Sequence, residues 1–268
     1  MQCRVEVFQA LSALIDPMLP LAPLVMLVSL RIGVAFAAMP SPFGSGAPVQ
    51  SRAVLGFLLG VALCLPRPEL AQNMSIDPYW LAYASLGEVL VGSVIGLTVR
   101  VTIAAVEAAG AFVGFSAGLA FAQSVDPTFG ESNSPPARLL GSFAVLLFFV
   151  LQGHHAVLAA LARSLDFAPP GRALAAVDHE GVLRIGAEMV AQGLRIAAPV
   201  VGTMFLVQLG LALVSRAAPK VHLFSLSFAV AVSAGVLTLF AAAPALAPAI
   251  AQEIHDLPAA LSAALGIR

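Results

Sequence analysis

Long apolar runs follow one another along most of this chain, and only short polar stretches separate them. A transmembrane α-helix needs about 20 consecutive apolar residues to cross the hydrocarbon core of a bilayer, and most of these runs reach that length. We therefore predict an all-α, multi-helix integral membrane protein. Its expected helices lie close to residues 21–40, 53–66, 79–99, 101–123, 139–162, 188–214 and 223–251.

The composition indicates the same environment. Of 268 residues, 60% are hydrophobic and 10% are charged, whereas ordinary soluble domains carry about 25% charged residues. A soluble core of this length could not bury so much apolar surface. The formal net charge of −1 gives no reason to expect a nucleic-acid partner. Cys3 and Cys64 form neither a metal-binding spacing nor a disulfide framework, so no metal or cofactor is expected.

Two features predict helices that are kinked or re-entrant. The run at 53–66 is too short to span alone, so it is expected to be re-entrant or packed inside protein. The last two runs contain Pro199, Pro244 and Pro248, which predict kinks or breaks. No internal repeat and no separate soluble domain is evident, so residues 1–268 are expected to form a single membrane-embedded unit.

The positive-inside rule does not fix an orientation for these helices. If every run crosses the membrane, arginine and lysine divide almost equally between the two sides. One side would hold Arg4, Arg67, Arg138, Arg216 and Lys220, and the other Arg52, Arg100, Arg163, Arg172, Arg184 and Arg268. Either one run does not cross, or partner subunits hold the helices in place of a simple bilayer topology.

Glycine recurs at four-residue intervals in two of the expected helices. Residues four apart share one helix face, and glycine there lets a partner backbone approach closely. These faces are therefore expected to serve helix packing and assembly, through Gly92, Gly96, Gly110, Gly114 and Gly118.

Charged residues inside or beside the apolar runs need partners. Glu88 and Arg100 lie about 18 Å apart along one helix, so they cannot pair with each other. An unpaired charge at membrane depth costs at least about 2.5 kcal/mol. Arg31 and Glu107 pose the same question from the middle of their runs. Local ion pairs near the membrane interfaces and pairs across a subunit boundary both remain open; the candidates for inter-subunit contacts are Glu88, Arg100, Arg138, Arg216 and Lys220.

A polar loop, SVDPTFGESNSPP, separates the second glycine-rich helix from the next run. Asp126-Pro127 favours a turn, Gly130 permits a bend, and Pro135-Pro136 stiffens the exit. Phe129 is its one bulky apolar residue and would suit a narrow opening. From these residues alone, a plain surface turn and a moving or blocking part both remain possible.

Two chemical alternatives compete with a structural role. Gly114-Phe115-Ser116-Ala117-Gly118 fits the GxSxG pattern of serine hydrolases, and His154-His155 lies on the next run. However, a nucleophile elbow needs a strand-to-helix turn, whereas Ser116 lies in a continuous helix pattern. Adjacent histidines point about 100° apart on a helix, which is poor for joint metal ligation. A proton-coupled transporter using Glu88 or Glu107 would be expected to show internal repeats, and none is evident.

Several segments together resemble the family of the flagellar biosynthetic protein FliR. They are GEVLVGSVIGLTVR, EAAGAFVGFSAGLAFAQSVDPTFG, LLFFVLQGHHAVLAALARSL with a following PPG, and GLALVSRAAPKVHLF, in the same order over about residues 25–250. The chain departs from the family at Ser227-Phe228-Ala229, where Gly-Phe-Pro is frequent, and at His155 and Lys220.

The resemblance implies a non-enzymatic component of the flagellar type III export gate in the bacterial inner membrane, within the basal body. Its partners would be FliP and FliQ homologues, with an FlhB homologue against them, in a helical assembly through which unfolded flagellar subunits pass. The loop that helps to close the pore would correspond here to Gln123, Asp126, Pro127, Phe129, Gly130, Pro135 and Pro136. The equivalent injectisome subunit is the nearest alternative.

Overall fold

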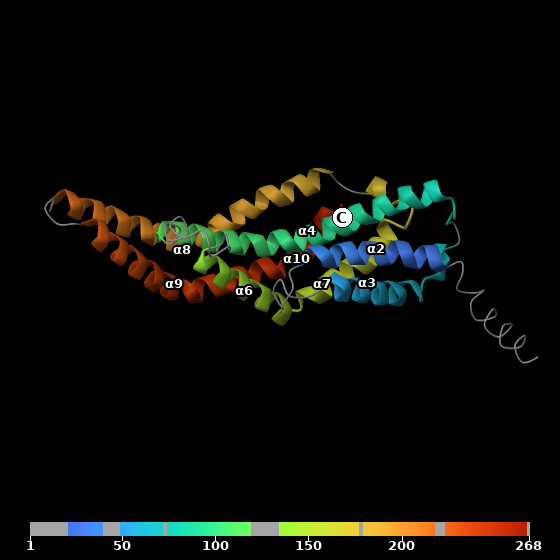
Figure 1. The fold of residues 1–268 in the computed structure, drawn as a ribbon, viewed down its shortest axis with the longest axis horizontal. Helices are drawn as coiled ribbons and strands as arrows, with labels where there is room; N and C mark the ends of the chain where they lie inside the picture. The colour runs from blue at the N-terminus through green and yellow to red at the C-terminus, as the bar shows by residue number, and fades with distance from the viewer. Residues whose placement is uncertain are drawn as a thin grey trace, which may run out of the picture. The chain divides into compact units, whose positions relative to one another are not determined.

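The computed structural model of the chain describes residues 21–39, 49–71, 74–118, 134–176, 179–217 and 223–266. All regular structure within these ranges is helical, which confirms the all-α prediction (Figure 1). The α-helices are α2 (Ala22–Ala38), α3 (Val49–Cys64), α4 (Pro78–Ser116), α6 (Pro135–Val150), α7 (Gly153–Phe167), α8 (His179–Ala217), α9 (Leu223–His255) and α10 (Leu257–Ala264). Two short 3₁₀ turns, η3 (Pro68–Ala71) and η5 (Ala173–Ala176), follow α3 and α7.

Helix α4 joins two runs that the sequence predicted as separate helices. It continues through Arg100 for 39 residues, which corresponds to about 58 Å of helix. Arginine is a good helix former and no proline lies within the helix after its first residue, so the charge at Arg100 interrupts the apolar pattern without interrupting the backbone. The prediction of a boundary at residue 100 is therefore wrong.

The run predicted as one helix at 139–162 is instead divided into two helices. The chain leaves the helical path at Leu151 and Gln152, and α6 and α7 meet at a bend of 65°. Helices α8 and α9 instead continue through Pro199, and through Pro244 and Pro248. The predicted breaks at these prolines do not occur.

Three helical stretches of the described chain are long and apolar enough to cross a membrane. They are Pro78–Ser116, Gly186–Ala217 and Phe228–Ala264, and the bent pair α6–α7 could form a fourth, broken span. Helices α2 and α3 are shorter, as the sequence predicted for the run at 53–66. Within the most apolar 18 residues of each long stretch, 56% is buried inside the chain for Pro78–Ser116. The corresponding shares are 22% for Gly186–Ala217 and 17% for Phe228–Ala264.

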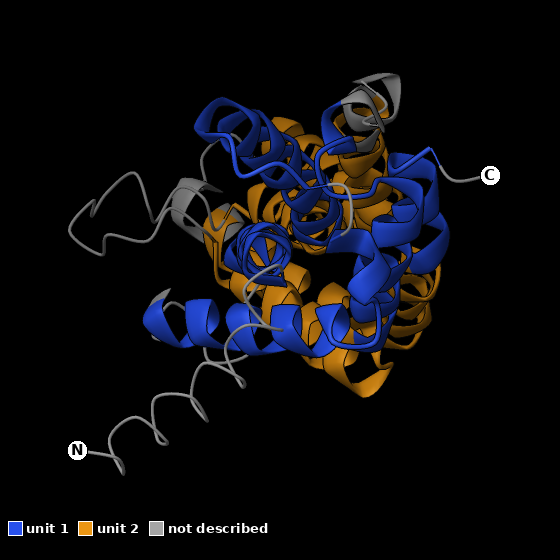
Figure 2. Cartoon of the chain, turned by 90° about the vertical axis from the view of Figure 1, so that its right-hand side faces the viewer, with its two compact units in different colours: residues 1–100, 155–182, 258–268 blue, residues 101–154, 183–257 orange. Residues whose placement is uncertain are grey.

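The residues gather into two compact units, coloured separately in Figure 2. Unit 1 comprises residues 1–100, 155–182 and 258–268, and unit 2 comprises residues 101–154 and 183–257. In unit 1, α2 packs against α3, and in unit 2, α6 packs against α9. Because each unit combines segments that are distant in sequence, neither is a contiguous domain. The sequence prediction that residues 1–268 form a single membrane-embedded unit stays a prediction.

Candidate functional site

The most buried polar cluster of unit 1 is built around Arg31 of α2. Its Nε donates to Oε2 of Glu88 at 2.6 Å, its Nη1 donates to Oγ of Ser164 at 2.8 Å, and its Nη2 donates to the carbonyl oxygen of Ala168 at 2.7 Å. Arg31, Glu88 and Ser164 are each 0% exposed. The Ser164 hydroxyl also donates to the Leu161 carbonyl at 2.7 Å. The guanidinium thus ties together α2, α4, α7 and the turn that follows α7.

Glycines on α4 make this cluster possible. A Cβ at Gly92 would overlap the carbonyl oxygen of Arg31, and a Cβ at Gly96 would lie 2.7 Å from the carbonyl oxygen of Ala35. The backbones of α2 and α4 therefore meet without intervening side chains. This approach places the charge of Arg31 beside Glu88, one helical turn before Gly92, and the planar guanidinium can serve several acceptors at once.

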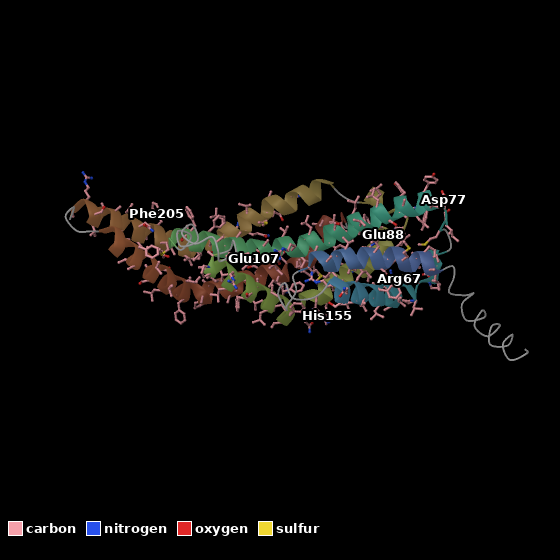
Figure 3. The ribbon with its side chains drawn as sticks, viewed as in Figure 1. Arg67, Asp77, Glu88, Glu107, His155 and Phe205 are labelled. Atoms are coloured by element: carbon pink, nitrogen blue, oxygen red, sulfur yellow. The ribbon has the colours of Figure 1, made fainter. Side chains whose placement is uncertain are left out.

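A second arginine holds the same end of α7. Arg67, which follows α3, bonds through Nη1 to Oδ1 of Asp166 at 2.7 Å and to the carbonyl oxygen of Ala162 at 3.2 Å. Figure 3 labels Arg67 and Glu88. Cations at the C-terminal end of a helix interact favourably with its last carbonyls. Two arginines from the first 70 residues therefore fix the end of a helix that begins at Gly153.

In unit 2, close packing brings α4 and α6 together at the polar loop. A Cβ at Gly110 would overlap Cα of Ala137, and a Cβ at Gly114 would overlap Oγ of Ser134. The Ser134 hydroxyl is buried and donates to the Gly110 carbonyl at 3.5 Å. Ser134, the first described residue after the segment 119–133, is thus fixed against the last turns of α4.

The residues just before that segment are also held. Helix α4 ends at Ser116, whose carbonyl oxygen accepts a hydrogen bond from Nε2 of Gln208 on α8 at 3.3 Å. The next residue, Ala117, is 1% exposed, and its methyl group fills the space above Gly235 of α9. We call this arrangement the loop base, and it consists of Gly110, Gly114, Ser116, Ala117, Ser134, Ala137, Gln208 and Gly235.

The predicted glycines divide into two kinds. Gly92, Gly96, Gly110 and Gly114 have close neighbours inside this chain, and their role in assembly with other subunits stays a prediction. Gly118 has no such neighbour among the described residues, and its role in assembly also stays a prediction. It lies beyond the end of α4 with φ of 74°, and a Cβ there would meet nothing within 4 Å. This left-handed conformation ends the helix, which is a common role of glycine.

The predicted polar and loop residues lie in different parts of the structure. Glu88 has an intrachain partner, Arg31, and its role in inter-subunit contacts stays a prediction. Arg100, Arg138 and Arg216 are exposed on α4, α6 and α8. Pro135 and Pro136 form the first turn of α6. The remaining predicted residues lie outside the described part of the chain, namely Gln123, Asp126, Pro127, Phe129, Gly130 and Lys220.

The residues proposed for hydrolysis or metal binding have local structural partners. The Ser116 hydroxyl donates to the Val113 carbonyl of its own helix at 2.9 Å, and the described residues contain no strand that could form a nucleophile elbow. The His154 ring stacks on Phe149 with centroids 5.5 Å apart. Within the same residues, no group of three or more His, Cys, Asp or Glu is placed to hold a metal ion.

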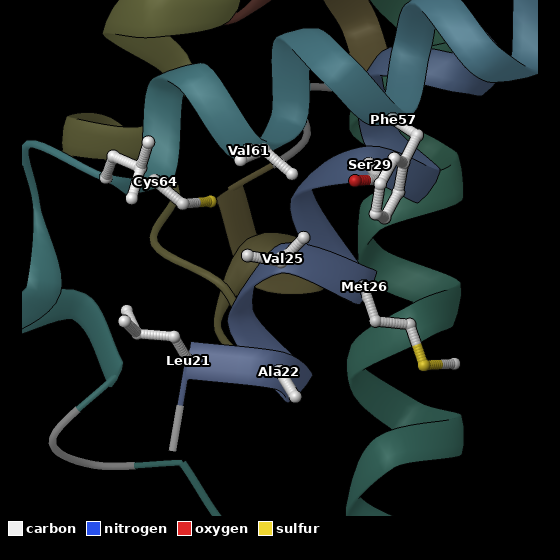
Figure 4. Close-up of a pocket in the computed structure, with 9 residues that line it drawn as sticks. Leu21, Ala22, Val25, Met26, Ser29, Phe57, Val61 and Cys64 are labelled. Atoms are coloured by element: carbon white, nitrogen blue, oxygen red, sulfur yellow. The ribbon is translucent and has the colours of Figure 1, made fainter. Parts of the chain in front are cut away.

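An apolar pocket of about 430 Å³ lies between α2 and α3 in unit 1 (Figure 4). It is lined by Leu21, Ala22, Val25, Met26, Ser29, Phe57, Val61, Cys64 and Leu65. Burial, and secondarily the nearby charge of Glu88, raises the pKa of the Cys64 thiol to about 11. The thiol is therefore protonated at neutral pH and is a poor nucleophile.

Sequence reasoning missed several residues of these clusters. The signal for Arg31 and Glu88 was present, since both are charges in apolar runs and have opposite sign. Ser164, Gln208 and Gly235 carry no comparable signal, because a lone polar or small residue in an apolar helix does not reveal its contacts.

Comparison with known proteins places this fold in a family. Residues 22–257 match the family described as bacterial export proteins, family 1. The chain is 30% identical over 227 residues to the flagellar biosynthetic protein FliR of Pectobacterium carotovorum subsp. carotovorum, covering 80% of this chain and 85% of that protein.

Further relatives come from flagellar and other transport systems. The chain is 26% identical over 209 residues to the flagellar biosynthetic protein FliR of Escherichia coli (strain K12), covering 78% and 80% of the two chains. It is 29% identical over 191 residues to the Yop proteins translocation protein T of Yersinia pestis, covering 67% and 73%. The resemblance to the FliR family is thereby confirmed, and the chain belongs to the bacterial export proteins, family 1.

Proposed function

We propose that this chain forms, with FliP and FliQ homologues, the gate of the flagellar type III export apparatus in the inner membrane. Unfolded flagellar subunits would pass through the gate, and an FlhB homologue would lie against it. Membership of the export-protein family and the long apolar helices support a membrane component of a type III export apparatus. The two FliR relatives named above favour the flagellar system because their matches cover 80% and 78% of the chain, against 67% for the match to the Yop translocation protein.

The loop base is the observation that carries a gating role. It fixes Ser116 and Ala117 at one end of the segment 119–133 through Gln208 and Gly235, and Ser134 at the other end through α4. Because packed helices fix the residues on both sides of this segment, the segment stays at one position, as a part that blocks an opening must. We therefore assign the segment, with Asp126, Phe129 and Gly130, to a plug that closes the pore at rest.

The plug must be held weakly enough to yield to an exported chain. A preference of a few kcal/mol keeps a two-state gate closed to the percent level or below, and a stronger preference would impede export. Replacing residues 124–131 by a Gly-Ser segment of equal length leaves both anchors of the loop base intact. We expect this variant to assemble with FliP and FliQ homologues and to let ions leak through the resting membrane, measured as membrane conductance or as growth under ionic stress.

A matched control replaces residues 40–47, another Pro-, Gly- and Ser-rich segment, by the same Gly-Ser sequence. This control should leave the membrane as tight as the unmodified protein does. If the 124–131 variant assembles with its partners and the membrane also stays tight, the plug assignment is wrong.

The injectisome is the second candidate because the Yop translocation protein is among the relatives. Expression in a strain that lacks its own FliR separates the two systems. Restored swimming supports the flagellar assignment, whereas restored secretion only in a strain that lacks the injectisome homologue supports the alternative.

A further inference from the structure

The turn between α6 and α7, residues 151–154, interrupts the apolar run at 139–162, the first that follows the segment 119–133. Helix α6 has 16 residues and α7 has 15, so they extend over about 24 and 22 Å. Each is shorter than the hydrocarbon core of about 30 Å. Neither helix can cross a bilayer alone. It must therefore be decided whether the turn between them lies in lipid or in water.

Backbone hydrogen bonds and aromatic packing define the conformation of the turn. The N–H groups of Leu151 and Gln152 donate to the carbonyl oxygens of Leu147 and Phe149 at 2.8 and 3.2 Å, which closes the end of α6. Gln152 has φ of 59°, the one non-glycine residue with a positive φ in the described part of the chain. Phe148 is buried against Gly153, where a Cβ would collide with its ring. The aromatic ring therefore requires glycine at the start of α7.

The polar groups of this turn have no place in hydrocarbon. A helix break leaves the last carbonyls of one helix and the first N–H groups of the next without intrahelical partners. The amide side chain of Gln152 is exposed and makes no side-chain hydrogen bond within the described residues. Irregular backbone at membrane depth is tolerated only where protein buries it or water reaches it. Leu151 is 43% exposed beside the exposed Gln152, so the described residues leave the tip of the turn uncovered, although Gly153 behind it is buried.

We propose that the turn at Gln152 lies in water, so that α6 and α7 form a re-entrant or broken pair whose turn faces an aqueous compartment. Water supplies the hydrogen-bond partners that the Gln152 amide lacks among the described residues. This inference does not depend on the plug assignment, because it concerns no residue of the segment 119–133 or of the loop base.

Thiol accessibility tests the proposal. In a background with Cys3→Ala and Cys64→Ala, one variant carries Gln152→Cys and a matched control carries Leu146→Cys. Leu146 is 59% exposed on the apolar surface of α6 and Gln152 is also exposed, so the described residues cover neither position. Intact cells and inverted membrane vesicles are treated with a membrane-impermeant maleimide, and labelling is normalised to that of the denatured protein.

We expect the thiol at position 152 to react at least about tenfold faster than the thiol at position 146 in one of the two preparations, because only the former lies in water. Equal and slow labelling of both, with full labelling after denaturation, would place the turn in lipid or beneath a partner subunit and overturn the proposal. If the Gln152→Cys chain does not accumulate, Leu151→Cys makes the same comparison from the neighbouring residue.

Discussion

Arg31 combines full burial with three hydrogen-bonded partners from distant parts of the sequence. Removing one member of a buried ion pair costs about 3–5 kcal/mol, because the other charge stays buried without compensation. We expect Arg31→Met or Glu88→Leu alone to destabilise the purified chain by this amount in SDS unfolding. The double variant should lose less than the sum of the two, since no unpaired charge remains.

Arg67→Met provides the control for this experiment. The Arg67–Asp166 pair is 30% and 64% exposed, and exposed pairs contribute at most about 1 kcal/mol. A loss at Arg67 as large as that at Arg31 would mean that the charge of the arginine, rather than its burial, determines the effect.

Substitution of Gly92 tests the contact between the backbones of α2 and α4 by adding a single methyl group. Gly92→Ala places a Cβ on the Arg31 carbonyl, and overpacking of this kind costs about 1–3 kcal/mol. Gly202 of α8 has nothing within 4 Å of the same position, so Gly202→Ala should stabilise the helix by up to about 1 kcal/mol. SDS unfolding midpoints of the two variants should move in opposite directions, and movement in the same direction would contradict this packing.

At the scale of helices, a substitution at the contact between α4 and α6 can distinguish packing within the chain from assembly with other subunits. Gly114→Leu should displace Ser134 in the isolated chain, and we expect faster proteolysis within 119–133 in detergent, before any partner is added. The control is Gly210→Leu on α8, which meets no neighbour. If Gly114→Leu leaves proteolysis unchanged and only abolishes co-purification with FliP and FliQ homologues, the face serves a partner subunit instead.

The sequence predicted the helical class and the membrane setting because both follow from apolar run length, which is a local property. It located α2 and α3 within a few residues. It did not predict the continuity of α4 through Arg100 or the break at Gln152. Helix continuity depends on which backbone hydrogen bonds tertiary packing supports, and Phe148 beneath Gly153 is a contact that no periodicity encodes.

The candidate site shows the same limit. The four-residue glycine spacing predicted close approach at Gly92, Gly96, Gly110 and Gly114, and each has a close neighbour. The spacing could not tell whether that neighbour belongs to the same chain. It also included Gly118, because a glycine that ends a helix cannot be distinguished by spacing from one that packs within it.

For the molecule as a whole, the distribution of apolar surface is uneven. Phe205 on α8 is 66% exposed and Phe240 on α9 is 81% exposed (Figure 3 labels Phe205). Such surfaces are too apolar for water and need lipid or protein beside them. We expect Phe205→Ser and Phe240→Ser to change the stability of the isolated chain by no more than about 0.5 kcal/mol, while co-purification with FliP and FliQ homologues decreases.

Phe148 is the control for this prediction because it is 1% exposed. Phe148→Ala should cost about 3–5 kcal/mol in the isolated chain. If the variants at 205 and 240 retain full co-purification, these faces contact lipid and not the partner subunits.

The division of unit 1 among three stretches of sequence has a consequence for how the chain is made. Glu88 follows Arg31 by 57 residues and Ser164 follows it by 133. At about 5–20 residues per second, the ribosome delivers Ser164 roughly 7–27 s after Arg31. Until Glu88 follows, roughly 3–11 s after Arg31 at the same rate, α2 carries an unpaired charge that costs about 2.5–3.5 kcal/mol to insert, so insertion machinery or the membrane surface must retain it. Since residues 258–268 also belong to unit 1, the unit that emerges first from the ribosome is completed last.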